Sequence, residues 1–130
     1  MNQTELDNAL IQAADCDFDY AQELISVGAN PNGMPLIMAI QCGAIDIVSL
    51  FITSGAELNV HYNETTPLIR AVTSGYPEIV QLLIENGANP EFTDANGKSA
   101  NHWLSVCSIP RLTVKNKLLI SEYIKSKKQI

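Results

Sequence analysis

The sequence predicts an all-α solenoid, a stack of about four helix-turn-helix units, and three observations lead to this prediction. The tetrapeptide Gly-Ala-Asn-Pro occurs at residues 28–31 and again at 87–90, and a related Gly-Ala pair begins at Gly55. Residues 34–58 match residues 66–90 at a constant offset of 32. Both segments carry apolar residues at the spacing of short helices. A period in this range is typical of repeat proteins, in which each unit packs on its neighbours.

Each repeat is expected to contain two helices. The pair Thr66-Pro67 is suited to begin a helix of about residues 67–74, because threonine caps the first turn and proline lacks only an N–H that would stay unpaired. Gly75 ends this helix, since glycine adopts a left-handed backbone readily. A second helix of about residues 77–85 is apolar on too wide a face for a surface helix, so we expect neighbours on both sides. Gly87 then ends it.

The phrase Thr66-Pro67-Leu68, followed by Ala71, Gly75 and Gly87-Ala88-Asn89, resembles the ankyrin repeat, most clearly over residues 33–97. The resemblance implies short β-hairpin fingers between units and a concave binding surface made of finger tips and first helices. It also implies one domain over the whole chain, with degenerate capping units at both ends. The expected units are residues 4–32, 33–63, 64–96 and 97–130.

The two terminal units depart from the repeat. Residues 20–25 stand where the second helix of the first unit is expected, after an Asp-rich turn. In the last unit, Ser99 and His102 occupy the positions of the family's Thr and His, which implies that His102 hydrogen-bonds around the turn with Ser99. No Gly-Ala pair ends the final helix, which is expected over about residues 112–127. We expect its buried face to carry Leu118, Leu119, Glu122 and Tyr123.

The fingers are expected to differ in length. Pro35 follows Gly28 by seven positions, whereas Pro67 follows Gly55 by twelve. The first finger is therefore reduced to residues 32–34, and the fingers at residues 60–65 and 91–98 are full length. This truncation makes the expected concave surface uneven.

Composition excludes several classes of protein. With 46% hydrophobic and 17% charged residues, the chain is expected to be globular and soluble rather than disordered. It has no apolar run long enough to span a bilayer and no secretory signal, so a cytoplasmic location is expected. The three cysteines, Cys16, Cys42 and Cys107, are scattered and form no disulfide framework or zinc motif. We expect them to be free thiols in a reducing compartment and to pack as small apolar side chains.

The sequence contains no catalytic, phosphate-binding or metal-binding motif, and we expect neither an enzyme nor a cofactor. Asp15, Asp17 and Asp19 have the spacing that begins a calcium loop. However, Tyr20 and Ser26 stand where that loop needs Gly and Glu, so we expect a solvated turn.

Two aromatic residues attract attention. His61, on the second finger, is expected to be a contact residue or solvated rather than a metal ligand. Trp103, the single tryptophan, is expected to pack in the core or cap, with a binding anchor as the alternative.

Charge is distributed unevenly. Residues 1–110 carry 13 acids and two bases, a net charge of −11, whereas residues 111–130 carry six bases and one acid, a net charge of +5. Because this basic tail lacks interleaved aromatic residues, we expect its lysines to be solvated on a capping helix, and we expect no binding to nucleic acid or membrane. The acidic body favours a protein partner with a basic surface.

The predicted function is therefore a non-catalytic protein-binding module that is a monomer when free, acting as an inhibitor or immunity protein for a basic toxin. The alternatives are an adaptor or secreted bacterial effector that acts on host proteins, or an enzyme without a recognisable motif. The resemblance implies contact residues on the fingers and first helices, of which Tyr62 is the strongest candidate. The candidate protein-binding residues are Gln41, Cys42, His61, Tyr62, Asn63, Glu64, Thr65, Thr73, Ser74, Ala95, Asn96, Lys98, Val106 and Cys107.

Overall fold

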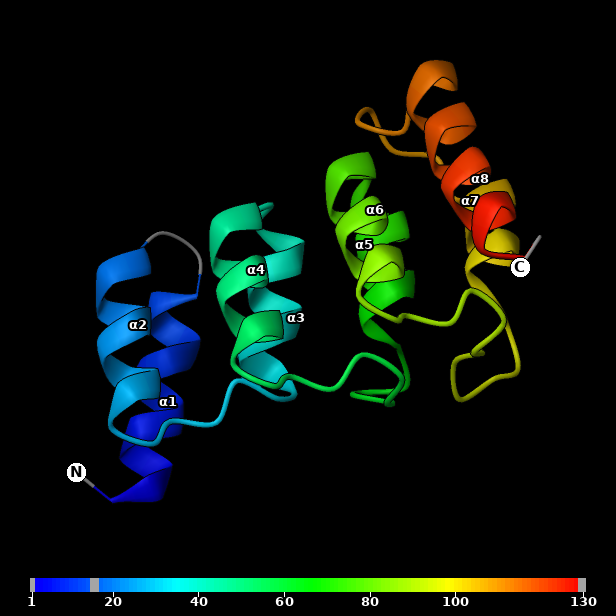
Figure 1. Cartoon of the computed structure of the whole chain (residues 1–130). Helices are drawn as coiled ribbons and strands as arrows, with labels where there is room; N and C mark the ends of the chain where they lie inside the picture. The colour runs from blue at the N-terminus through cyan, green and yellow to red at the C-terminus, as the bar shows by residue number, and fades with distance from the viewer. Residues whose placement is uncertain (1, 15–16, 129–130) are drawn as a thin grey trace. The chain divides into compact units, whose positions relative to one another are not determined.

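A computed structural model describes residues 2–14 and 17–128, apart from the side chains of residues 127 and 128. Within these ranges the chain forms eight helices and no strand (Figure 1). The helices are α1 (Gln3–Ala13), α2 (Phe18–Ser26), α3 (Met34–Gln41), α4 (Ile45–Thr53), α5 (Pro67–Ser74), α6 (Pro77–Glu85), α7 (Ala100–Val106) and α8 (Val114–Lys128). The all-α prediction is confirmed for these ranges. Asp15 of the suspected calcium loop and Cys16 lie outside the described residues, as do the side chains of Lys127 and Lys128 in the basic tail.

The chain divides into two compact units, Met1–Glu57 and Leu58–Ile130, and each contains two helix pairs (Figure 1). In the first unit α1 pairs with α2 and α3 with α4, while α1 packs on α3 and α2 on α4. In the second unit α5 pairs with α6 and α7 with α8, while α5 packs on α7 and α6 on α8. Each unit thus stacks first helices on first helices and second on second, as helix-turn-helix repeats do. The residue boundaries of the four repeats stay predictions.

The helices α5 and α6 begin and end where the sequence predicts. The Oγ1 of Thr66 accepts a hydrogen bond from the backbone N–H of Ile69 at 3.2 Å and so caps α5. Gly75 follows α5 with φ 78° and ψ 34°, the left-handed conformation. A Cβ at this position would lie 3.1 Å from side-chain atoms of Arg111, so a larger residue would also crowd the loop before α8.

Polar side chains, one from helix α1 and two from loops, hold the turns that follow the second helices. The side-chain oxygens of Asp7, Asn32 and Asn59 each accept a backbone N–H of an exit turn, at distances between 2.6 and 2.9 Å. The acceptor lies 23 to 30 residues before its donor. The bonds of Asn32 and Asn59 thus join one expected repeat to the next, whereas the bond of Asp7 lies within the first. These bonds satisfy backbone groups that the ends of the second helices leave unpaired.

The last helix buries a different face from the one expected. Ile120 and Ile124 have no exposed surface, and α8 packs on α6. Leu118, in contrast, is 61% exposed, and Glu122 is exposed. The prediction was therefore wrong for Leu118 and Glu122, whereas Leu119 and Tyr123 are half-buried. The side of α8 that is buried depends on where α6 lies, and the local pattern of leucines does not contain that information.

Candidate functional site

The finger before α5 folds back at a tight two-residue turn. The backbones of Tyr62 and Thr65 exchange two hydrogen bonds, at 2.8 and 3.1 Å. The residues between them, Asn63 and Glu64, have φ values of 48° and 68°. Positive φ at both central residues is the geometry of the tight hairpin turn that commonly uses Asn-Gly. Among the described residues, the expected β-hairpin finger is thus reduced to this single bridge.

The finger before α7 is organised by one buried carboxylate. Oδ1 of Asp94 accepts the backbone N–H groups of Asn96 and Lys98, both at 2.9 Å. Oδ2 accepts the indole N–H of Trp103 at 2.8 Å. The turn from Asp94 to Gly97, which the sequence indicated, is therefore held from inside and fastened to helix α7.

The surroundings of Asp94 keep it ionised. Burial, which leaves 5% of Asp94 exposed, opposes the charged form and by itself raises the pKa. The hydrogen bonds from the Lys98 N–H, the Trp103 indole and the Asn96 N–H outweigh burial, and nearby His102 adds to them. The net result is a pKa below the usual 3.8, so the carboxylate is an acceptor at neutral pH.

Trp103 and His102 differ from their predicted roles in detail. The indole of Trp103 is half-buried and fastened to Asp94, so its packing role is combined with a place at the surface of a groove. The side chain of Ser99 makes no capping hydrogen bond, and within the described residues the ring of His102 makes none either. The imidazole instead packs edge-on against Trp103, at a centroid distance of 5.5 Å. The family's hydrogen bond from this histidine was therefore a wrong expectation here.

The two fingers of the second unit are joined to each other. The backbone N–H of Ala95 donates to the carbonyl of Glu64 at 3.1 Å. The Nε2 of His61 lies 2.7 Å from the carbonyl oxygen of Thr93, and its ring stacks on Phe92 at 4.8 Å. His61 is exposed, but these contacts give it a structural task that the sequence did not reveal.

A groove of about 280 Å³ lies between these fingers and the helices α5 and α7. It is lined by Asn63, Glu64, Thr65, Ile69, Arg70, Thr73, Asp94, Asn96 and Trp103. The structure thus brings together five of the candidate binding residues, namely Asn63, Glu64, Thr65, Thr73 and Asn96. Sequence reasoning missed the contributions of Ile69, Arg70 and Asp94. Their helical and turn positions explained them fully as structural residues.

Arg70 is the cation of this groove. It projects from α5, is half-buried, and its Nε is a buried donor without a hydrogen-bond acceptor within the described part of the chain. A buried donor without an acceptor costs about 1–3 kcal/mol. Such a group gains from any ligand acceptor that reaches it.

The other candidate residues lie outside the groove. Gln41 and Cys42 are exposed at the end of α3, in the first unit. Ser74 and Cys107 are half-buried in the second unit. The carbonyl of Ser74 accepts a hydrogen bond from the Arg111 guanidinium at 2.9 Å. The thiol of Cys107 lies 3.7 Å from the carbonyl oxygen of Thr73.

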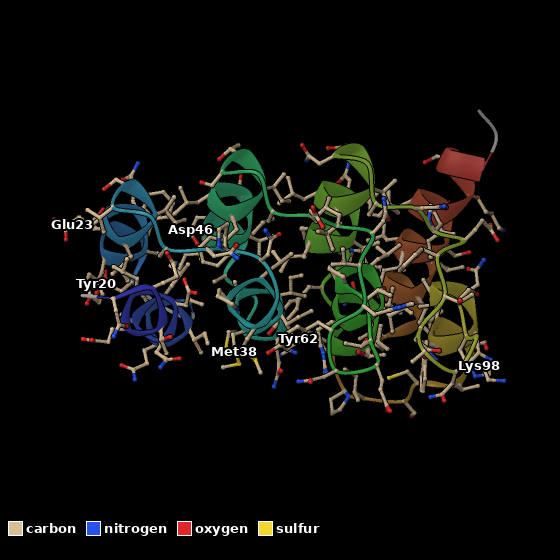
Figure 2. All side chains as sticks on the ribbon, turned by 90° about the horizontal axis from the view of Figure 1, so that it is seen from below. Tyr20, Glu23, Met38, Asp46, Tyr62 and Lys98 are labelled. Atoms are coloured by element: carbon tan, nitrogen blue, oxygen red, sulfur yellow. The ribbon has the colours of Figure 1, made fainter. Side chains whose placement is uncertain are left out.

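Three exposed candidates and Tyr62 complete the set. Ala95 and Lys98 are exposed on the last finger, and Val106 is 55% exposed at the end of α7 (Figure 2 labels Lys98). Tyr62 is half-buried, so it does not project freely as expected (Figure 2). Whether these residues bind a partner stays a prediction.

The described residues were also searched for a metal site and for a helix that could span a membrane. Within the described ranges, no three His, Cys, Asp or Glu side chains are grouped so that they would hold a metal ion. No helix in the described part of the chain has both the length and the apolarity to cross a membrane.

The family model for ankyrin repeats, in three copies, matches residues 9–94. No curated protein matches this sequence.

Proposed function

We propose, from the premise that this chain belongs to the ankyrin-repeat family, that it binds a basic protein through the groove of its second unit and thereby inhibits that protein. Ankyrin repeats indicate a protein–protein interaction module. The finer proposal is a dedicated cytoplasmic inhibitor or immunity protein without catalytic activity. A reducing compartment agrees with the two described cysteines, Cys42 and Cys107, which are free thiols.

The observation that carries the proposal is the turn at Asn63 and Glu64, on the rim of the groove. A side chain other than glycine costs about 1–2 kcal/mol in a left-handed backbone. Glutamate nevertheless occupies the second position, with φ 68° and an exposed side chain. Strained residues of this kind are concentrated at binding sites. The exposed carboxylate of Glu64 is well suited to pair with a lysine or arginine of a partner.

The floor of the groove supports recognition of a polypeptide. Arg70 lacks an acceptor for its buried Nε, and a carbonyl of a partner's backbone in the groove would supply one after a small rotation of the side chain. The half-buried indole of Trp103 offers an apolar surface beside it. One short segment of a basic protein would supply both groups: a lysine or arginine side chain for Glu64 at the rim, and a backbone carbonyl for Arg70 in the groove.

The charge of the first unit supports a basic partner as well. Residues 1–57 contain eight acids and neither lysine nor arginine, a net charge of −8. Residues 58–130 contain six acids and eight bases, a net charge of +2, and the two units together give the −6 of the chain. A field of this size attracts basic proteins over a Debye length of about 10 Å and raises their association rate.

The test is a pull-down from the native source with three tagged chains: wild type, Glu64→Lys and the control Glu78→Lys. Glu78 is exposed on α6, does not line the groove, and its reversal changes net charge by the same amount. We expect one basic protein to be retained at low salt by wild type and by the control, and lost with Glu64→Lys. Equal retention by all three chains would show that the groove is the wrong surface.

A second experiment separates inhibition from scaffolding. The retained protein is expressed alone and then together with this chain, and growth or the protein's own activity is measured. Inhibition predicts that the activity appears only when this chain is missing or carries Glu64→Lys. Retention of several unrelated proteins, none of them inhibited, would favour an adaptor.

A further inference from the structure

The first unit has an open apolar surface beside α1 and α2. A depression of about 320 Å³ between α1 and α2 is lined by Leu6, Tyr20, Glu23, Leu24, Ser26 and Val27, which we call the acidic end face. Tyr20 is 40% exposed and Val27 is 65% exposed. Figure 2 shows Tyr20 and Glu23 on the side of α2 that faces away from α4.

The repeat itself indicates that a neighbour fits on such a face. Ile47 of α4 stands 27 residues after Tyr20, at the same place relative to the Gly-Ala pair, and only 1% of it is exposed. The helix that carries Ile47 packs on α2. The equivalent position is thus buried in α4, which has α2 as a neighbour, and exposed in α2.

The second unit has an open apolar surface of the opposite charge. A depression of about 610 Å³ between α7 and α8 has Leu104, Val114, Lys117, Leu118 and Lys125 in its lining, and we call these residues the basic end face. Val114 is 77% exposed and Leu118 is 61% exposed. They lie four residues apart on α8, hence on one side of the helix, and the two lysines flank them.

We infer that the basic end face of one copy binds the acidic end face of a second copy, so that the protein assembles head to tail. The two faces are both apolar, and their charges are complementary: Glu23 stands beside one and Lys117 and Lys125 beside the other. The net charges of the two whole units, −8 and +2, are complementary as well. Such a contact would continue the stacking of second helices on second helices.

This assembly goes beyond the proposed function, because neither end face includes a residue that lines the groove. It differs from the monomer expected from sequence. Because the two faces are different, the contact is heterologous, and each dimer keeps one free face of each kind. Association is then expected to continue beyond the dimer as concentration rises.

The first experiment is sedimentation velocity from about 1 μM to about 1 mM at low and high salt. We expect the average sedimentation coefficient to rise with concentration without reaching a plateau at the dimer, and to rise less at high salt. The variants Glu23→Lys, Leu118→Asp and Lys117→Glu/Lys125→Glu each weaken association by at least about fivefold. Glu78→Lys, which lines neither face, and Glu64→Lys, which lines the groove, leave it unchanged.

A mixing experiment tests the head-to-tail geometry itself. The Glu23→Lys chain keeps an intact basic end face, and the Lys117→Glu/Lys125→Glu chain keeps an intact acidic one. Each is expected to associate at least about fivefold more weakly alone, because its two faces then carry charge of the same sign. Their mixture is expected to recover association, because the intact faces pair and the two reversed faces are again of opposite charge. All altered side chains are at the surface, and circular dichroism verifies that each variant is folded. The inference is overturned if wild type stays monomeric throughout, or if Glu23→Lys associates as wild type does.

Discussion

The two units of the molecule have the same arrangement of helices but different links between their helix pairs. In the first unit seven residues, 27–33, join α2 to α3, whereas in the second unit fourteen residues, 86–99, join α6 to α7. The short link uses Asn32, whose side-chain oxygen accepts one backbone N–H. The long link uses Asp94, whose carboxylate accepts three donors and is fastened to Trp103. The long link contributes Asp94 and Asn96 to the polar groove, together with residues of α5 and α7, whereas the short link contributes none.

The two units also differ in charge. The first unit contains no lysine or arginine, whereas the second contains all eight basic residues of the chain. The groove thus lies in the unit with mixed charge, and the long-range negative field arises in the other. In the proposed function, the first unit steers a basic partner and the second unit contacts it.

The largest expected effect comes from removing the carboxylate of the long link. Asp94→Ala leaves three donors without their acceptor, and we expect it to reduce the free energy of unfolding by about 3 kcal/mol. Asn32→Ala removes one acceptor from the short link, for a loss of about 1 kcal/mol. Hydrogen exchange by residue should show the first loss in residues 58–130 and the second in residues 3–57. Equal losses for the two substitutions would contradict the difference between the links.

The stability of the second unit should depend on pH through the carboxylate of Asp94. Because the folded pKa of Asp94 lies below 3.8, its charge contributes stability that is fully present above pH 3.8 and is lost as pH falls through the folded pKa. Asp94→Asn removes this contribution at every pH. The difference in unfolding free energy between wild type and Asp94→Asn should therefore be largest near neutral pH and shrink below about pH 4. Urea denaturation across this range measures it, and a constant difference would contradict the proposed charge.

A smaller effect is expected from the indole that donates a hydrogen bond to this carboxylate. Trp103→Phe keeps an aromatic ring but removes the N–H donor, and we expect a loss of about 1–2 kcal/mol in the free energy of unfolding. The control His102→Ala removes only an edge-on contact and should cost about 0.5 kcal/mol. A double-mutant cycle of Trp103→Phe with Asp94→Asn should show coupling of about 1 kcal/mol. Additive losses would show that the bond contributes nothing.

The smallest expected effect has the opposite sign. Glu64→Gly relieves the left-handed strain of the second finger and should raise the free energy of unfolding by about 0.5 kcal/mol, after the entropy cost of glycine. The same replacement at Glu78, inside α6, should lower it by about 1 kcal/mol. Thermal unfolding compares the two. If the groove binds a partner through Glu64, the more stable variant is also the weaker binder, and unchanged binding would remove the main support for the proposed site.

The sequence by itself determined the helices of the repeat and their order. Caps, prolines and glycines act on the backbone within a few residues, so Thr66 and Gly75 mark α5 whatever packs around it. It also determined the short first link, because the interval between two Gly-Ala pairs counts the available residues. The existence of α8 was predicted from a continued helical pattern without a Gly-Ala pair to end it.

Only the tertiary structure decided which side of α8 is buried, which residues meet in the groove, and what holds the fingers. Ile120 faces inward because α6 lies on that side, and Asp94 is a triple acceptor because α7 brings Trp103 to it. Likewise Arg70, an ordinary helix residue in the sequence, becomes a buried donor without an acceptor only when both fingers close over α5. These properties arise from contacts between residues far apart in the chain, and local residue preferences do not encode such contacts.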